Sequence, residues 1–262
     1  MNLDLSKKTA IVSGSTQGIG FAVAQELALL GANVTLMARN EDSLREAIDK
    51  LDNQQGQIHR YIVADFAQAG QVQHAIDNYL RLCPEVHILI NNTGGPSGGA
   101  IIEADTDQFL RTFQMHLINY QILAQAVVPF MKSAGFGRIV NVISTSVKQP
   151  IVGLGVSNTI RGAVASWAKT LASELAPFGI TTNNVLPGYT VTARLEAVLQ
   201  MKSAASGKTT DVVAEELKST IPTRRFVEAK EVGAAVAFLC SPVAGSINGI
   251  NLPVDGGRTE SL

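Results

Sequence analysis

Apolar residues recur along this chain in two alternating patterns. Short runs rich in Val, Ile and Leu are separated by longer segments in which apolar positions return every three or four residues. Uninterrupted apolar runs are typical of strands buried on both faces of a parallel sheet, and the longer period is that of amphipathic helices. Their alternation predicts one doubly wound α/β domain over residues 1–262, with a seven-stranded parallel sheet and helices on both faces.

The boundaries of the runs give the individual elements. The predicted strands are residues 9–13, 34–38, 60–64, 86–90, 138–143, 181–186 and 249–254. The predicted helices are residues 19–30, 42–51, 72–82, 107–132 and 158–176. Strands of about five residues and helices of 10 residues or more are ordinary lengths for these elements.

A polar insert at residues 190–226 breaks the alternation. Long inserts after a parallel strand lie over the ligand crevice, so we expect a small substrate lid here; a plain surface loop is the alternative. Residues 203–211, SAASGKTTD, are expected to be mobile. Residues 211–220 are expected to form a short amphipathic helix that begins after an Asp211 cap.

Composition narrows the classes of function. The chain has 21 Lys and Arg against 22 Asp and Glu, which argues against electrostatic binding to nucleic acid or to a membrane. No apolar run approaches the ~18 residues that span a bilayer, and no signal peptide precedes the first strand. Cys83 and Cys240 have no CxxC spacing, so we expect reduced, buried thiols in a cytoplasmic protein, without a metal site.

A glycine-rich loop, SGSTQGIG at residues 13–20, joins the first predicted strand to the first helix. Gly14, Gly18 and Gly20 permit a tight turn and a close approach of the backbone to a ligand. The helix that follows offers free N–H groups and the positive end of its dipole to a pyrophosphate. A glycine triplet alone is weak evidence, but its place between strand and helix predicts a dinucleotide-binding Rossmann fold.

The end of the second strand indicates which dinucleotide is bound. NAD-binding proteins usually carry an acidic residue about 20 positions after the glycines, where it accepts hydrogen bonds from the ribose hydroxyls. Here that place holds Ala38, followed by Arg39. A guanidinium suits a 2′-phosphate, so the sequence favours NADP(H). A solvated arginine at the end of a strand is the alternative.

Five motifs in order resemble those of the short-chain dehydrogenase/reductase family over essentially the whole chain. They are SGSTQGIG, VADFA with Asp65, NNTG with Asn91, Thr93 and Gly94, LPGYTVT with Pro187, Gly188 and Thr192, and LPVDGG. The resemblance, together with the glycine loop, assigns the following residues to NADP(H): Ser13, Gly14, Ser15, Gln17, Gly18, Ile19, Gly20, Arg39, Asp65, Phe66, Asn91, Thr93, Gly94, Arg161, Pro187, Gly188 and Thr192.

The active site that the family resemblance implies is an Asn-Ser-Tyr-Lys set, and only its serine is kept. The asparagine position falls on His116 and the serine on Ser144. Ser157 stands in place of the tyrosine and Arg161 in place of the lysine, and no tyrosine lies between Tyr120 and Tyr189. The chain thus resembles a divergent branch that lacks the YxxxK motif, a branch that includes an NADPH-dependent reductase of conjugated enones.

These replacements change the chemistry that is possible. A serine is a much weaker acid than a tyrosine and ends closer to the backbone, and an arginine binds anions but does not shuttle protons. Histidine has an ordinary pKa near neutrality, so His116 is either a proton donor or a buried structural residue. Lys148, in the loop after Ser144, is either a second cation of the site or solvated. The candidate catalytic residues are Ser144, Ser157, Arg161, His116 and Lys148.

Three functions stay open at this point. The first is conjugate reduction of a small enone, in which charge stabilisation replaces acid catalysis. The second is slow ketone reduction with His116 or water as the acid. The third is a catalytically inactive NADP(H)-binding sensor or assembly subunit. Family members commonly assemble as tetramers, so the resemblance implies a homo-oligomer, a tetramer or a dimer, acting on a small-molecule substrate.

Overall fold

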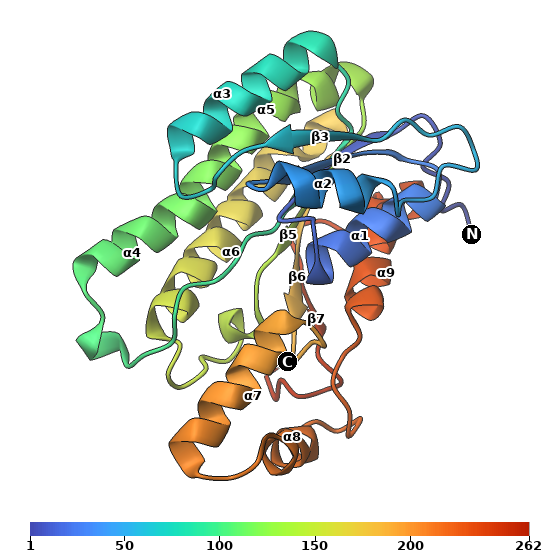
Figure 1. The fold of residues 1–262 in the computed structure, drawn as a ribbon. Helices are drawn as coiled ribbons and strands as arrows, with labels where there is room; N and C mark the ends of the chain where they lie inside the picture. Colours follow the sequence, from blue (N-terminus) through green and yellow to red (C-terminus); the bar gives the residue numbers. More distant parts are fainter. Residues whose placement is uncertain (262) are drawn as a thin grey trace.

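The computed structural model describes residues 1–261 and has a parallel sheet of seven strands at its centre (Figure 1). The strand order is β3-β2-β1-β4-β5-β6-β7. The strands are β1 (Thr9–Ser13), β2 (Asn33–Ala38), β3 (Arg60–Val63), β4 (Ile88–Asn91), β5 (Gly137–Val142), β6 (Ile180–Pro187) and β7 (Asn251–Val254). The order reverses between β1 and β4, and ligands of doubly wound folds bind at that switch point.

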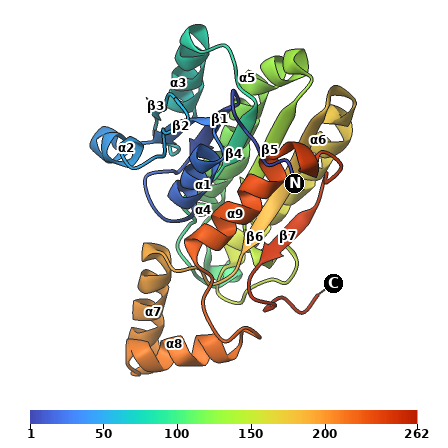
Figure 2. The same ribbon diagram turned by 90° about the vertical axis from the view of Figure 1, so that its right-hand side faces the viewer.

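Helices cover both faces of the sheet. On one face lie α1 (Gly18–Leu29), α2 (Glu41–Ile48) and α9 (Ala229–Cys240), with α1 and α9 side by side (Figure 2). On the other face lie α3 (Ala69–Leu82), α5 (Asn119–Ala134) and α6 (Gly155–Leu175). Successive β1 residues serve the two faces, because Val12 packs into the first core and Ile11 into the second.

A line of four asparagines crosses the sheet from β4 to β7. Asn91, Asn141, Asn184 and Asn251 are register partners on neighbouring strands. Each of the first three side-chain amides donates to the oxygen of the next at 2.8 Å. We name this line the amide ladder. It pairs most of the amide groups of these buried side chains, where unpaired amides would be costly.

The predicted strands are confirmed to within about two residues at their ends. The predicted helix 107–132 is instead divided into α4 (Thr106–Phe113), one π-helical turn (Gln114–Ile118) and α5. A π turn adds one residue to the helical repeat without changing the apolar pattern visibly, so the sequence period does not reveal it. His116 lies in the middle of this turn.

The polar insert folds into two helices that project beyond the carboxyl ends of the strands (Figures 1 and 2). They are α7 (Ala193–Ser206) and α8 (Thr210–Ser219). Residues 203–211, the segment expected to be mobile, are largely helical. Helix α7 ends at Ser206, and Gly207 follows it with a left-handed φ of 69°. The expected Asp211 cap is wrong, because the Thr209 side chain accepts from Val212 N instead and Asp211 lies in the first turn.

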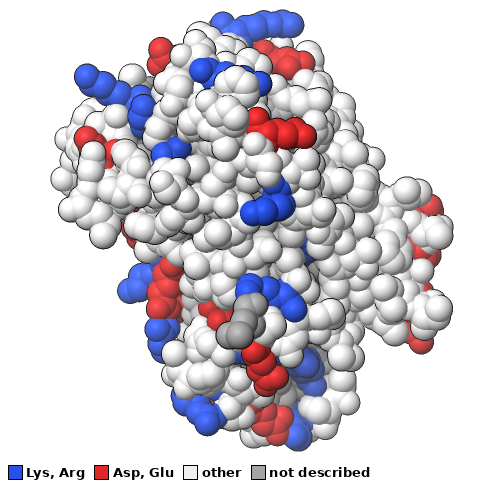
Figure 3. Space-filling model, turned by 180° about the vertical axis from the view of Figure 1, so that it is seen from behind, with Lys and Arg blue, Asp and Glu red and all other residues white. Residues whose placement is uncertain are grey.

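Charged groups are dispersed over the surface. On the face drawn in Figure 3, basic and acidic side chains are interspersed with large uncharged areas. Among residues 1–261, no helix is long and apolar enough to cross a membrane. Both cysteines are free; Cys240 is buried, which raises the pKa of its thiol to about 12, whereas Cys83 is only half-buried, contrary to the expectation for that residue.

Candidate active site

The glycine loop lies at the switch point and has no room for side chains. Gly14 and Gly18 both have a φ of +58°, which favours glycine over any other residue. A Cβ on Gly20 would overlap the Gly14 carbonyl oxygen and would lie 2.7 Å from Asn92 Nδ2. Gln17, the residue before α1, supplies no side-chain cap, so the first N–H groups of α1 are left for a ligand. This cradle fits a pyrophosphate.

Asn92 links the glycine loop to the end of β4 by hydrogen bonds. Its side-chain amide donates to Gly14 O at 2.9 Å and to Ser13 O at 3.3 Å. In return, Ser13 Oγ accepts from Asn92 N at 3.0 Å. The sequence reasoning missed Asn92, although it lies inside NNTG, because it assigned the neighbouring Asn91 and Thr93 to the cofactor.

Three residues predicted to bind the cofactor are completely buried, and their side chains bind neighbouring parts of the chain. Ser13 Oγ is engaged with Asn92, and Ser15 Oγ accepts from Met37 N at 3.0 Å. Asn91 is the first member of the amide ladder. Gln17, Gly18, Thr93 and Gly94 of the same motifs are exposed or half-buried, and Ile19 is half-buried against the first core.

The adenosine end of the crevice is formed after β2 and β3. Arg39 directly follows β2, is exposed, and makes no ion pair with any residue from 1 to 261. Asp65 follows β3 and its carboxylate accepts from Ala67 N at 2.9 Å. The Phe66 side chain is buried, and its carbonyl accepts from Asn119 at 2.7 Å. Arg39 is thus the free cation of this end.

The residues predicted to border the nicotinamide follow β6. Gly188 lies so close to Asp255 that a Cβ would come within 2.7 Å of the Asp255 Cβ. Thr192 precedes α7, and its methyl group would lie 3.3 Å from a Cβ on Gly18. The start of the polar insert therefore lies against the glycine loop.

Arg161 is the central charge of the candidate catalytic group. The residue is 9% exposed, and burial lowers the pKa of its guanidinium from the ordinary value. An arginine keeps its charge at neutral pH even so. Its Nε donates to Ser157 Oγ at 3.3 Å and its Nη1 to Val142 O at 3.4 Å, both long bonds, and no carboxylate within the described chain pairs with it. Arg161 can therefore still bind an anion.

Ser144 and Lys148 bracket the turn after β5. Ser144 is half-buried and caps the 3₁₀ turn Thr145–Val147, its Oγ accepting from Ser146 N at 3.1 Å. The hydroxyl hydrogen of Ser144 is still available to a ligand. Lys148 is half-buried at the end of the same turn and has no carboxylate partner among residues 1–261.

His116 lies behind Arg161 rather than in open space. It is 1% exposed, its Nδ1 is 3.4 Å from the Tyr120 hydroxyl, and its Nε2 has no partner in the described chain. Burial, and secondarily the Arg161 charge, lower the pKa of His116 well below 6.5, so the ring is neutral at pH 7. Burial likewise raises the pKa of the nearby Tyr120 above its ordinary value. Neither group is a ready acid at neutral pH.

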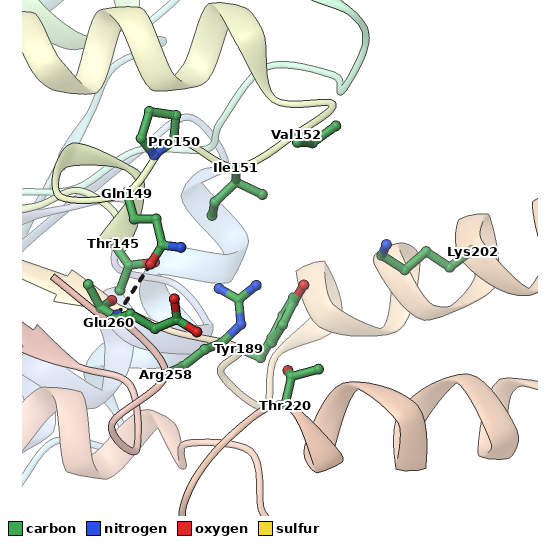
Figure 4. A pocket seen from close by; sticks show the side chains of 11 residues that line it. Thr145, Gln149, Pro150, Ile151, Val152, Tyr189, Lys202, Thr220, Arg258 and Glu260 are labelled. Atoms are coloured by element: carbon green, nitrogen blue, oxygen red, sulfur yellow. Dashed lines mark hydrogen bonds between the residues drawn. The ribbon is translucent and has the colours of Figure 1, made fainter.

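A cavity of about 380 Å³ opens beside this group (Figure 4). Its walls come from the loop after Ser144, the residue after the Pro-Gly pair, both insert helices and the C-terminal segment. The lining residues are Thr145, Gln149, Pro150, Ile151, Val152, Tyr189, Lys202, Thr220, Arg258, Thr259 and Glu260. The size suits a small molecule. Sequence reasoning missed Arg258, since only the fold brings it to this place.

Known proteins resemble the chain along its whole length. A family described as Enoyl-(Acyl carrier protein) reductase matches residues 14–259. The human dehydrogenase/reductase SDR family member 4 (Homo sapiens) is 30% identical over 259 residues, covering 98% of this chain and 90% of its own. The structure of YwfH, an NADPH dependent reductase involved in bacilysin biosynthesis, has a TM-score of 0.92 at 27% identity, covering 98% of this chain and 100% of its own. L-Sorbose reductase from Gluconobacter frateurii, complexed with NADPH and L-sorbose, has a TM-score of 0.93 at 28% identity over 100% of both chains.

Proposed function

Because the chain belongs to the short-chain dehydrogenase/reductase family, we propose that it is an NADP(H)-dependent oxidoreductase that reduces the conjugated double bond of a small enone. The observation that carries this proposal is Arg161, a buried cation without a carboxylate partner among residues 1–261, in the place where the family has a lysine. Arg161 can stabilise negative charge that develops on the substrate, and the tyrosine that serves as the acid in the family is replaced by Ser157.

Two observations support NADP(H). YwfH is described as NADPH dependent, and L-sorbose reductase was solved with NADPH. In this chain Arg39 is exposed directly after β2, with no acidic residue in the position that NAD-binding proteins use for the ribose. Gly14, Gly18 and Gly20 would hold the pyrophosphate, and Pro187 and Gly188 would border the nicotinamide.

Reduction of an enone matches what these side chains can do. When bound, the nicotinamide supplies a hydride, which conjugate reduction delivers to the β-carbon. The electron pair of the double bond then moves to the carbonyl oxygen, where Arg161 and the Ser144 hydroxyl can stabilise the negative charge. The proton that completes the saturated product arrives at the α-carbon from water. No step requires an acid of the strength of a tyrosine beside a lysine.

The absence of that acid also favours a second candidate, an inactive NADP(H)-binding sensor or assembly subunit. Reduction of ordinary ketones is less well supported, because it needs an acid for the alkoxide and the pKa of the neutral His116 is lowered by burial. The three functions differ in what they consume. A sensor binds NADPH and oxidises none, an enone reductase oxidises it with enones, and a ketone reductase with saturated ketones.

The test combines binding and turnover. NADPH binding is measured by fluorescence titration, and NADPH oxidation is followed with matched pairs of an enone and its saturated ketone. We expect turnover with enones only, and Arg161→Met to lower kcat by about 100-fold, the effect of losing one stabiliser of developing charge. Arg81→Met, the same change on an exposed arginine of α3, should leave kcat unaltered. Tight binding without oxidation of any pair would favour the sensor.

A further inference from the structure

The cavity beside the candidate catalytic group is strongly divided in character (Figure 4). Pro150, Ile151 and Val152 form an apolar wall on one side. On the opposite side the Arg258 guanidinium and the Tyr189 hydroxyl face the open space, and the Lys202 amine points toward it from α7. A small molecule seated here would have an apolar body and a polar, negatively charged end.

Arg258 is held in place by a turn that the Asp255 carboxylate organises. The buried carboxylate of Asp255 accepts from Gly257 N at 2.9 Å and from Thr259 N at 2.8 Å, and from Thr259 Oγ1 at 2.6 Å. Gly256 and Gly257 have φ values of +68° and +85° that the turn requires. Arg258 projects from its apex and stacks over the Tyr189 ring, 4.7 Å from the centroid.

The guanidinium of Arg258 has binding capacity to spare. Its Nε is buried and has no hydrogen-bond partner in the part of the chain that the structure describes. No carboxylate oxygen of those residues lies within 4.0 Å of it. Its Nη groups face the open space of the cavity and make no hydrogen bond to the described residues, so they are free to bind a ligand.

Glu260 is the one acidic side chain that lines the cavity, and it does not neutralise the two cations. It is exposed, and its main-chain N–H is bound to Gln149 Oε1 at 3.2 Å. Arg258 and Lys202 together outnumber it, which leaves the lining with a formal excess of one positive charge. Neither cation takes part in an ion pair within residues 1–261.

We propose that Arg258, assisted by Lys202 and the Tyr189 hydroxyl, binds a carboxylate of the substrate, so that the substrate class is the small enone carboxylic acid. This assignment rests on the proposed function. The planar fork of a guanidinium fits the two oxygens of a carboxylate. The apolar wall of residues 150–152 receives the carbon skeleton, and the enone end reaches toward Ser144, next to Thr145 of the cavity lining.

The test compares an acid with its ester. The probes are (E)-4-oxo-4-phenyl-2-butenoate and its methyl ester, which share the enone and differ in charge. We expect wild-type kcat/KM to favour the acid, and Arg258→Met to lower kcat/KM for the acid by about 10- to 100-fold while leaving the ester unchanged, as the loss of a charged hydrogen bond predicts. Arg258→Lys should restore part of the loss, Lys202→Met should cost less, and Arg81→Met should cost nothing.

A binding measurement separates this proposal from the proposed function. The saturated acid 4-oxo-4-phenylbutanoate is added to the NADPH complex, and the rise in Tm is compared between wild type and Arg258→Met. If binding depends on Arg258 but neither probe is turned over, the proposed enone reductase activity is excluded and the proposed carboxylate site is supported. Turnover of acid and ester at equal rates, or an equal loss for both in Arg258→Met, would overturn the carboxylate site and keep the reductase.

Discussion

The two ends of the crevice differ in how completely their polar groups are paired. At the nucleotide end, Ser13, Ser15 and Asn92 bind the backbone of the loop and of its neighbours. At the catalytic end, Arg161 makes only long hydrogen bonds, and the His116 Nε2 and the Arg258 Nε have no partner in the described chain. The side chains of the glycine loop are thus paired with one another and with the backbone, and Arg39 beside them has no ion pair in the described chain, whereas the polar groups of the second end lack close partners.

This difference indicates what each end recognises. When the side chains of a loop are hydrogen-bonded within the protein, the loop presents its backbone N–H groups to a ligand of constant shape, such as a pyrophosphate. Unpaired charged side chains are costly unless a ligand completes them, so they mark where the substrate contributes its own charge. Changes to the glycine loop should therefore weaken dinucleotide binding, a change at Arg39 should alter which dinucleotide binds, and changes at the catalytic end should alter which substrate reacts.

Gly20→Ala should have the largest effect. The added Cβ would overlap the Gly14 carbonyl and approach Asn92 Nδ2, which leaves no way to keep the loop closed. We expect NADPH affinity to fall more than about 100-fold and unfolding free energy to fall by about 1–3 kcal/mol. Gly162→Ala on α6, where nothing lies within 4 Å of the new Cβ, is the control. Normal NADPH titration of Gly20→Ala would contradict a cradle without spare room.

Asn92→Ala tests the same end with a smaller change. It removes the donors to Gly14 O and Ser13 O, and losing two hydrogen bonds of ordinary strength should lower the free energy of unfolding by about 1–3 kcal/mol. NADPH affinity should fall along with the stability of the loop. Denaturant titration with and without NADPH measures both, and Asn53→Ala, at an exposed asparagine before β3, is the control. An unchanged affinity would show that the loop closes without Asn92.

Arg39→Asp changes the choice of dinucleotide rather than the cradle. An acidic residue in this position repels a 2′-phosphate and accepts hydrogen bonds from ribose hydroxyls. We expect the ratio of NADPH to NADH affinity to fall by about 10- to 100-fold, from the loss of one charged hydrogen-bond donor. Arg60→Asp, at the opposite end of its strand from the crevice, should leave the ratio alone. Equal ratios in both variants would exclude Arg39 from the phosphate site.

His116→Gln should have the smallest effect, visible as a change in pH dependence. Because burial lowers the pKa of His116 in the folded state, the unfolded chain binds a proton that the folded chain does not, and stability declines as the pH falls below about 6.5. The variant should lose less stability between pH 7.5 and pH 5.5, by at most about 1.4 kcal/mol per pH unit. The half-buried His87, whose pKa burial also lowers, is present in both proteins and cancels. Identical pH profiles would show that burial leaves the pKa of His116 unchanged.

The sequence predicts the seven strands and the glycine loop because short apolar runs and glycines act locally. The same reasoning could not find the π turn around His116, since one additional residue in a helix hardly disturbs the apolar period. It could not find Arg258 either. That residue reaches the cavity only because the Asp255 turn directs it there and Tyr189, 69 positions earlier in the chain, lies beneath it.

The family resemblance puts Ser157 and Arg161 in the positions of the tyrosine and the lysine, and helix α6 brings these two residues, four apart, into contact at 3.3 Å. Which residues surround them was beyond the sequence. The neutrality of His116, for instance, depends on burial between helices that are distant in the chain, and on the charge of Arg161. Such properties arise from packing, and no local pattern encodes them.

The amide ladder favours the correct register of the strands when the sheet forms. If one of β4 to β7 paired with its neighbour one residue out of register, its asparagine would point to the opposite face of the sheet. The asparagine amides on the neighbouring strands would then be buried without a partner. Each unpaired amide costs about 1–3 kcal/mol, so a shifted register is destabilised at several places at once. Strands β1, β2 and β3 have no such line of asparagines within the described chain, and their alignment relies on backbone pairing, on apolar contacts and on single side-chain bonds such as that from Met37 N to Ser15 Oγ.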